Sequence, residues 1–139
     1  MEAGEEIIFG EDKFMDNFTK EEFEEALRAI TSTISKSEKV QLKLKAGTFQ
    51  YTMTVQGIKA YYIAIDLIKR ALETNITEDS FERKYRKEEL EEAILVITSV
   101  ITRVEKVLPK LKTGTSQHTL AVRRIKAFNI ATELITREL

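Results

Sequence analysis

One stretch of the chain occurs twice and decides the fold. Residues 87–115 read KEELEEAILVITSVITRVEKVLPKLKTGT, and residues 20–48 read KEEFEEALRAITSTISKSEKVQLKLKAGT. Both belong to longer repeats, residues 11–72 and 78–139, which align without a gap at an offset of 67 residues and share 33 of 62 positions. Such self-similarity indicates one structural unit used twice. We expect the two units and the joint between them, residues 73–77, to form a single domain spanning residues 1–139.

Apolar residues in each unit follow the spacing of two amphipathic helices. The first helix of the second unit carries Leu90, Ile94, Ile97, Ile101, Val104, Leu108 and Leu111, and the first unit has Phe23, Leu27, Ile30, Ile34, Ser37, Gln41 and Leu44 there. The following segments carry Val55, Ile58, Tyr61, Ile65, Ile68 and Leu72, and Val122, Ile125, Phe128, Thr132, Ile135 and Leu139. This spacing predicts a helical hairpin in each unit. Two hairpins can bury their apolar faces together, which predicts an all-α, up-down-up-down four-helix bundle.

Residues that start and stop helices support this division. Thr19 and Glu22 fit a capping box, in which each side chain accepts a hydrogen bond from a backbone amide of the other residue. Gly47-Thr48 and Gly114-Thr115 follow lysine-containing helix ends. Glycine suits a left-handed stop and threonine suits a helix N-cap, so we expect the hairpin turns there.

The third helix is expected to differ at both ends. Arg86 stands where the first unit has its capping threonine, and Asp79 with Glu82 can cap earlier, so this helix is expected to start sooner than the first. Pro109 removes an amide donor and is expected to kink or end the helix near Leu108.

The first unit is polar at several positions where the second is apolar. Ser37 and Gln41 lie on the apolar stripe, so either they form a buried hydrogen-bonded pair or the first helix is more peripheral than the third. Leu95 lies outside the stripe of the third helix, where the first helix has Arg28. An additional apolar residue there would suit a surface for self-association, so a homodimer is one expectation.

Composition limits the function classes. The net charge of −1 provides no overall field that attracts nucleic acid or an anionic membrane. Cysteine is absent, which excludes disulfides, cysteine zinc sites and thiol nucleophiles. We find no signal peptide and no run of about 20 apolar residues that would span a membrane. These features predict a cytoplasmic protein.

An acidic run opens the first helix of each unit, at Glu21–Glu25 and at residues 88–92. Carboxylates from two helices could hold a metal ion, as in a metal-dependent hydrolase. Di-iron bundles also need a Glu-x-x-His pair on two helices, and helical pyrophosphohydrolases need a later Glu-x-x-Asp pair, which this chain lacks. Acidic residues are also stabilised by the positive end of a helix dipole. We therefore predict no catalytic residue, no metal site and no cofactor.

Basic and neutral polar residues surround the turn of each hairpin. They are Lys43, Lys45, Thr48, Gln50, Lys110, Lys112, Thr115, Gln117 and His118. An up-down-up-down bundle would place both turns at one end, where two helix N-termini with free amides could bind an anion. The alternative is that the lysines complement helix C-termini and the threonines only cap helices.

The segment Lys110–Phe128, KLKTGTSQHTLAVRRIKAF, resembles a loop and helix found in small uncharacterised helical proteins of Clostridium-like bacteria. The pattern recurs more weakly in residues 43–61. The resemblance implies a cytoplasmic helical-hairpin protein, and it brings no activity and no site residues with it.

Two functions are compatible with these features. The first is a non-enzymatic interaction or regulatory module that binds an unknown protein partner or a second copy of itself. The second is a binder of phosphate-bearing ligands, a nucleotide or nucleic acid, at the lysine, threonine and glutamine residues of the turns.

Overall fold

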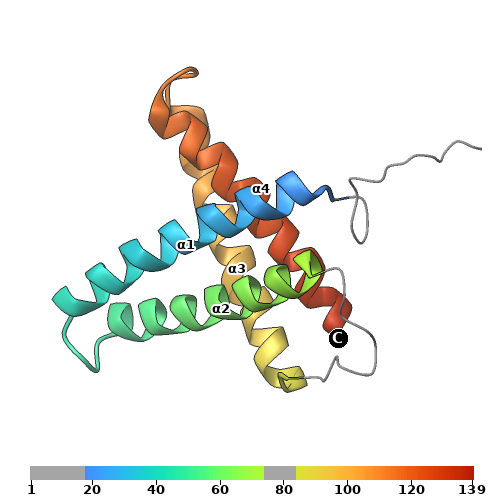
Figure 1. Ribbon diagram of the computed structural model, residues 1–139. Helices are drawn as coiled ribbons and strands as arrows, with labels where there is room; N and C mark the ends of the chain where they lie inside the picture. The colour runs from blue at the N-terminus through green and yellow to red at the C-terminus, as the bar shows by residue number, and fades with distance from the viewer. Residues whose placement is uncertain (1–17, 74–83) are drawn as a thin grey trace, which may run out of the picture.

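The computed structural model describes residues 18–73 and 84–139, and these residues form four α-helices. The helices are α1 (Lys20–Lys43), α2 (Phe49–Leu72), α3 (Lys87–Val107) and α4 (Ser116–Glu138), and a short 3-10 turn, η3 (Leu108–Lys110), follows α3. α1 packs against α2 and α3 packs against α4 as two hairpins (Figure 1). The predicted all-α four-helix bundle of two hairpins is confirmed. Among the described residues, no helix is long and apolar enough to cross a membrane.

The two hairpins cross each other, and their turns lie at the tips of separate arms (Figure 1). The prediction that both turns share one end of the bundle is therefore wrong. The reason lies in where the apolar faces stop. In α1 the last buried residue is Ile34, and in α2 the first is Gly57. Closer to the turn, neither α1 nor α2 has a buried residue, so this part of the first hairpin does not pack against the second.

Each helix contributes the half that lies away from its turn to a shared core. The largest fully buried side chains of this core are Phe23, Ile30, Ile68, Leu90, Ile97, Phe128, Ile130 and Ile135. Ala64 and Ala131, at equivalent positions of α2 and α4, are completely buried. Three residues of the predicted stripes, Val55, Val122 and Leu139, are exposed instead. The two valines lie toward the tips of the arms, and Leu139 follows the last residue of α4.

Inter-hairpin contacts repeat with approximate twofold symmetry. The ammonium group of Lys126 in α4 lies 3.1 Å from the carboxylate of Glu22 in α1. At the equivalent place, Lys59 in α2 lies 3.6 Å from Glu89 in α3. Hydrogen bonds from the N-cap backbone amides hold the pKa of both glutamates below the ordinary value. The paired lysines lower the pKa further. The hairpins are therefore related by a pseudo-twofold axis.

Tyr61 and Phe128 mark this axis. They occupy equivalent positions in the two repeats, and their ring centroids are 5.3 Å apart in the centre of the molecule. Both side chains are buried. The axis therefore passes between two aromatic rings that pack against each other.

The predicted caps of α1 and of the hairpin turns are confirmed. Glu22 accepts a hydrogen bond from the Thr19 amide at 2.9 Å, and Thr19 accepts one from the Glu22 amide at 3.0 Å. Thr48 and Thr115 are the N-caps of α2 and α4. The glycines of both turns have φ of +92°, a left-handed conformation that glycine adopts without strain.

The ends of α3 agree only in part with expectation. α3 begins at Lys87, the equivalent of the first residue of α1, so the predicted earlier start is wrong. Glu89 accepts a hydrogen bond from the Arg86 amide at 3.0 Å, which is the half of a capping box that needs no threonine. Asp79 and Glu82 lie outside the described residues. The predicted effect of Pro109 is confirmed, because α3 ends at Val107 and the proline lies in η3.

Replacing Ala64 with leucine should lower the free energy of unfolding by about 1–3 kcal/mol, because the close contact around this alanine has no room for a larger side chain. Urea denaturation followed by circular dichroism measures the change. The matched control is Ala46→Leu, at an exposed position in the turn between α1 and α2. Its free energy of unfolding should stay within about 0.5 kcal/mol of that of the unmodified protein. Equal stability of the two variants would contradict a tightly packed crossing.

Candidate functional site

The structure divides the predicted anion site into two groups at separate tips. Lys43, Lys45, Thr48 and Gln50 lie around the turn of the α1–α2 hairpin, and Lys110, Lys112, Thr115, Gln117 and His118 lie around that of the α3–α4 hairpin (Figure 1). The two turns are apart because the hairpins cross. An anion site built from both turns is therefore not formed.

Hydrogen bonds within each turn already satisfy the threonines. The hydroxyl of Thr48 donates to the Lys45 carbonyl at 2.8 Å and accepts from the Tyr51 amide at 3.2 Å. The hydroxyl of Thr115 forms the equivalent bonds to Lys112 and His118. One amide of each helix N-terminus is thus occupied by the protein itself, which favours the capping interpretation of these residues.

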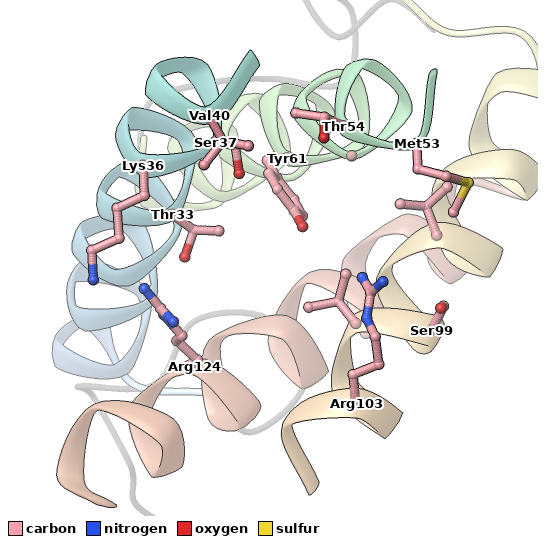
Figure 2. Close-up of a pocket in the computed structure, with 13 residues that line it drawn as sticks. Thr33, Lys36, Ser37, Val40, Met53, Thr54, Tyr61, Ser99, Arg103 and Arg124 are labelled. Carbon is pink, nitrogen blue, oxygen red and sulfur yellow. The ribbon is translucent and has the colours of Figure 1, made fainter. Parts of the chain in front are cut away.

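A different site lies in the notch where the two hairpins diverge. It is a pocket of about 290 Å³ to which all four helices contribute (Figure 2). Its lining is Thr33, Lys36, Ser37 and Val40 of α1, Met53, Thr54, Gly57 and Tyr61 of α2, Val96, Ser99, Val100 and Arg103 of α3, and Arg124 of α4. None of the predicted anion-binding residues belongs to this lining.

Three positively charged side chains gather at the pocket, and none of the described residues that line it is acidic. Arg103 and Arg124 point into the space and Lys36 lies at its edge (Figure 2). Within residues 18–73 and 84–139, none of these three cations forms an ion pair. The pocket therefore concentrates uncompensated positive charge on a protein whose net charge is −1.

The Tyr61 hydroxyl faces the same space (Figure 2). Burial raises the pKa of Tyr61, and the nearby Arg103 and Arg124 partly oppose that rise, so the hydroxyl stays protonated at neutral pH. It forms no hydrogen bond with another described residue and is available as a donor. Gly57 leaves room beside it, since a Cβ at that position would lie 3.4 Å from the hydroxyl oxygen.

The hydroxyl groups of the pocket differ in availability. Thr33 donates to the Ala29 carbonyl and Thr54 to the Gln50 carbonyl, both at 2.9 Å, so their protons are committed to their own helices. Ser37 and Ser99 form no such bond. The free donors of the pocket are therefore the three cations, the two serines and Tyr61.

Arg124 is held in an unusual environment. Its Nε atom is buried and has no hydrogen-bond partner among the residues that the structure describes. A buried donor on a charged group that lacks a partner destabilises a folded protein by about 1–3 kcal/mol or more.

Sequence reasoning missed most of this site. The sequence pattern places Tyr61 on the apolar stripe and assigns no role to Arg124. One available signal was the cation at the same position of both repeats, Lys36 and Arg103. A second was the polar character of the first unit, because Thr33 and Ser37 line the pocket where the core stripe of α1 ends.

The polar residues of the α1 stripe are not buried together. Ser37 and Gln41 are both partly exposed, and Gln41 donates to the Tyr51 hydroxyl at 3.4 Å instead of pairing with Ser37. The alternative of a buried hydrogen-bonded pair is therefore wrong. The equivalent residues of α3, Val104 and Leu108, are also partly exposed.

The acidic runs form contacts between the hairpins. Glu22 and Glu89 are paired with lysines of the opposite hairpin, as described above. In the described part of the chain, no group of three or more histidine, cysteine, aspartate or glutamate side chains is placed to hold a metal ion.

The fold and this pocket define a class, a small all-α protein of two crossed, duplicated hairpins with a basic notch between them. Comparison with known proteins found no protein-family model, no curated protein and no solved structure that matches the chain.

Replacing Arg124 with methionine should raise the free energy of unfolding by about 1 kcal/mol, because it removes a buried donor that lacks a partner but keeps most of the side-chain volume. Denaturant unfolding measures this effect. Arg123→Met, one residue earlier and exposed, should change stability by less than about 0.5 kcal/mol. A loss of stability in Arg124→Met would mean that the protein satisfies this guanidinium.

Proposed function

We propose that this chain is a cytoplasmic binding protein for a phosphate-bearing ligand, which it holds in the pocket between the two hairpins. The observation that carries the proposal is the convergence of Lys36, Arg103 and Arg124 on one pocket whose described lining residues include no acid. The role is binding and not catalysis, because the available groups are cations and hydroxyl donors and include no nucleophile with an adjacent base.

The chemistry of the donors supports phosphate over other anions. Guanidinium groups present parallel N–H donors that match two phosphoryl oxygens, and lysine adds a compact positive charge. The Tyr61 hydroxyl can donate a further hydrogen bond at the floor of the pocket. A ligand there would contact both hairpins and would stabilise their association.

Phosphate should raise the thermal stability of the protein, because a ligand that binds only the folded state adds about 2.7 kcal/mol at a hundredfold excess over its Kd. The measurement is thermal melting in increasing phosphate at constant ionic strength. The double variant Arg103→Gln, Arg124→Gln should lose this shift, since it removes both guanidinium groups of the pocket.

The control is Lys43→Gln, Lys110→Gln, which removes two charges from the tips and none from the pocket. It should keep the phosphate shift. Loss of the shift in the control alone would place the anion at the turns. A melting temperature that does not respond to phosphate in the unmodified protein would contradict the proposed function.

A second candidate is a protein-interaction module that self-associates, supported by large apolar side chains at the surface. Leu42 is 87% exposed and Phe49 is 77% exposed, and both lie at the tip of the α1–α2 hairpin. Leu95 on α3 is 72% exposed. Single exposed apolar residues are common, but the two at one tip could meet their equivalents in a second copy.

If this tip joins two copies, the double variant Leu42→Glu, Phe49→Glu should be monomeric at concentrations where the unmodified protein is dimeric, because it places carboxylates in the contact. Light scattering coupled to size-exclusion chromatography measures the mass. Leu95→Glu tests the alternative surface on α3. A monomer at every concentration in the unmodified protein would remove self-association.

A further inference from the structure

We infer that the ligand of this pocket is a compact diphosphate, of the pyrophosphate class, that bridges α1 to α3 and α4 across the pseudo-twofold axis. This inference rests on the proposed phosphate-binding function and specifies its ligand. It follows from the position of the pocket, the arrangement of its charges and its size.

The pocket lies on the pseudo-twofold axis. Its lining includes both members of three equivalent pairs, Thr33 with Val100, Lys36 with Arg103, and Gly57 with Arg124. Tyr61 also lines it, and its ring packs against the equivalent Phe128. A ligand in the pocket is therefore approached by corresponding positions of the two hairpins.

The equivalent cations favour a ligand with charge at both ends. Lys36 of the first hairpin and Arg103 of the second both line the pocket, with Lys36 at its edge (Figure 2). In a diphosphate, two phosphoryl groups flank a bridging oxygen, so the ligand itself has approximate twofold symmetry. One phosphoryl group can face Lys36 while the other faces Arg103, with Arg124 beside them as a further guanidinium donor.

The number of cations in the pocket also favours a diphosphate. A monoanion would leave two of the three cations uncompensated in a pocket whose described lining has no carboxylate. A diphosphate carries several negative charges at neutral pH and can compensate all three. That lining also offers no carboxylate ligand for an accompanying Mg²⁺ ion, which proteins usually bind through one or two carboxylates.

The size and walls of the pocket disfavour a nucleotide or nucleic acid. Its volume of about 290 Å³ lies at the lower edge of the roughly 300–1,000 Å³ that is usual for ligand pockets. Bases are commonly held by stacking on exposed aromatic rings. Tyr61 is the only aromatic residue in the described lining. This residue is 6% exposed, and its ring packs on Phe128. The pocket therefore has neither the volume for a sugar and base nor an exposed aromatic ring on which a base could stack.

Isothermal titration calorimetry of the full chain with pyrophosphate, orthophosphate, ADP and ATP, without divalent cations, tests the inference. Pyrophosphate should bind at least tenfold more tightly than orthophosphate, and ADP should bind no more tightly than pyrophosphate. Orthophosphate that binds as tightly as pyrophosphate, or ADP that binds tenfold more tightly, would overturn the diphosphate ligand and leave the phosphate-binding function standing. No binding of any of the four would overturn both.

Lys36→Gln separates the bridge from a general effect of charge. It should reduce the ratio of pyrophosphate to orthophosphate affinity at least fivefold, because only the longer ligand needs the cation on α1. Lys39→Gln makes the same change on the same helix at an exposed position outside the pocket and should leave the ratio unchanged. An equal effect of both variants, or an unchanged ratio in Lys36→Gln, would overturn the bridge.

Discussion

The crossing of two equivalent hairpin faces is the constraint on which the rest of the structure depends. Each hairpin buries its apolar face against the other copy of that face, and fully buried alanines, Ala64 and Ala131, leave room for a close approach. The reciprocal pairs Glu22–Lys126 and Glu89–Lys59 hold the same orientation from both sides. Because contact is concentrated in the halves of the helices away from the turns, the two arms separate beyond it. The basic pocket occupies the notch that this separation creates.

The repeat, the helices and most of their ends follow from local chemistry, and so they could be predicted from the sequence. Capping by Thr19, the positive φ of the turn glycines and the effect of Pro109 each depend on a few neighbouring residues. The crossing could not be predicted in this way, because it depends on which part of each apolar face meets the other hairpin. The early end of the core in α1, where Ser37 and Gln41 replace apolar residues, is the sequence feature that agrees with divergent arms.

The candidate site was less predictable for the same reason. Its members come from four helices and are far apart in the sequence, so no motif of fixed spacing contains them. Lysines beside helix N-termini form a local pattern that predicts an anion site at the turns. That site needs both turns at one end of the molecule, and the structure places them at separate tips. The residues that do converge, Lys36, Arg103 and Arg124, each resemble ordinary surface cations of an amphipathic helix. Only the fold shows that they share one space, in which none of the described lining residues is acidic.

The pair Gly57 and Arg124 shows what covalent joining of the two units makes possible. A homodimer of one unit would place identical residues on both sides of its axis, either two glycines or two arginines. Two glycines would supply space without the guanidinium, and two arginines would fill the notch and repel each other. In the single chain one copy leaves the opening and the other brings the charge. The tandem arrangement thus places an asymmetric pocket on the axis of a nearly symmetric scaffold. Two identical subunits could not form such a pocket on their own twofold axis.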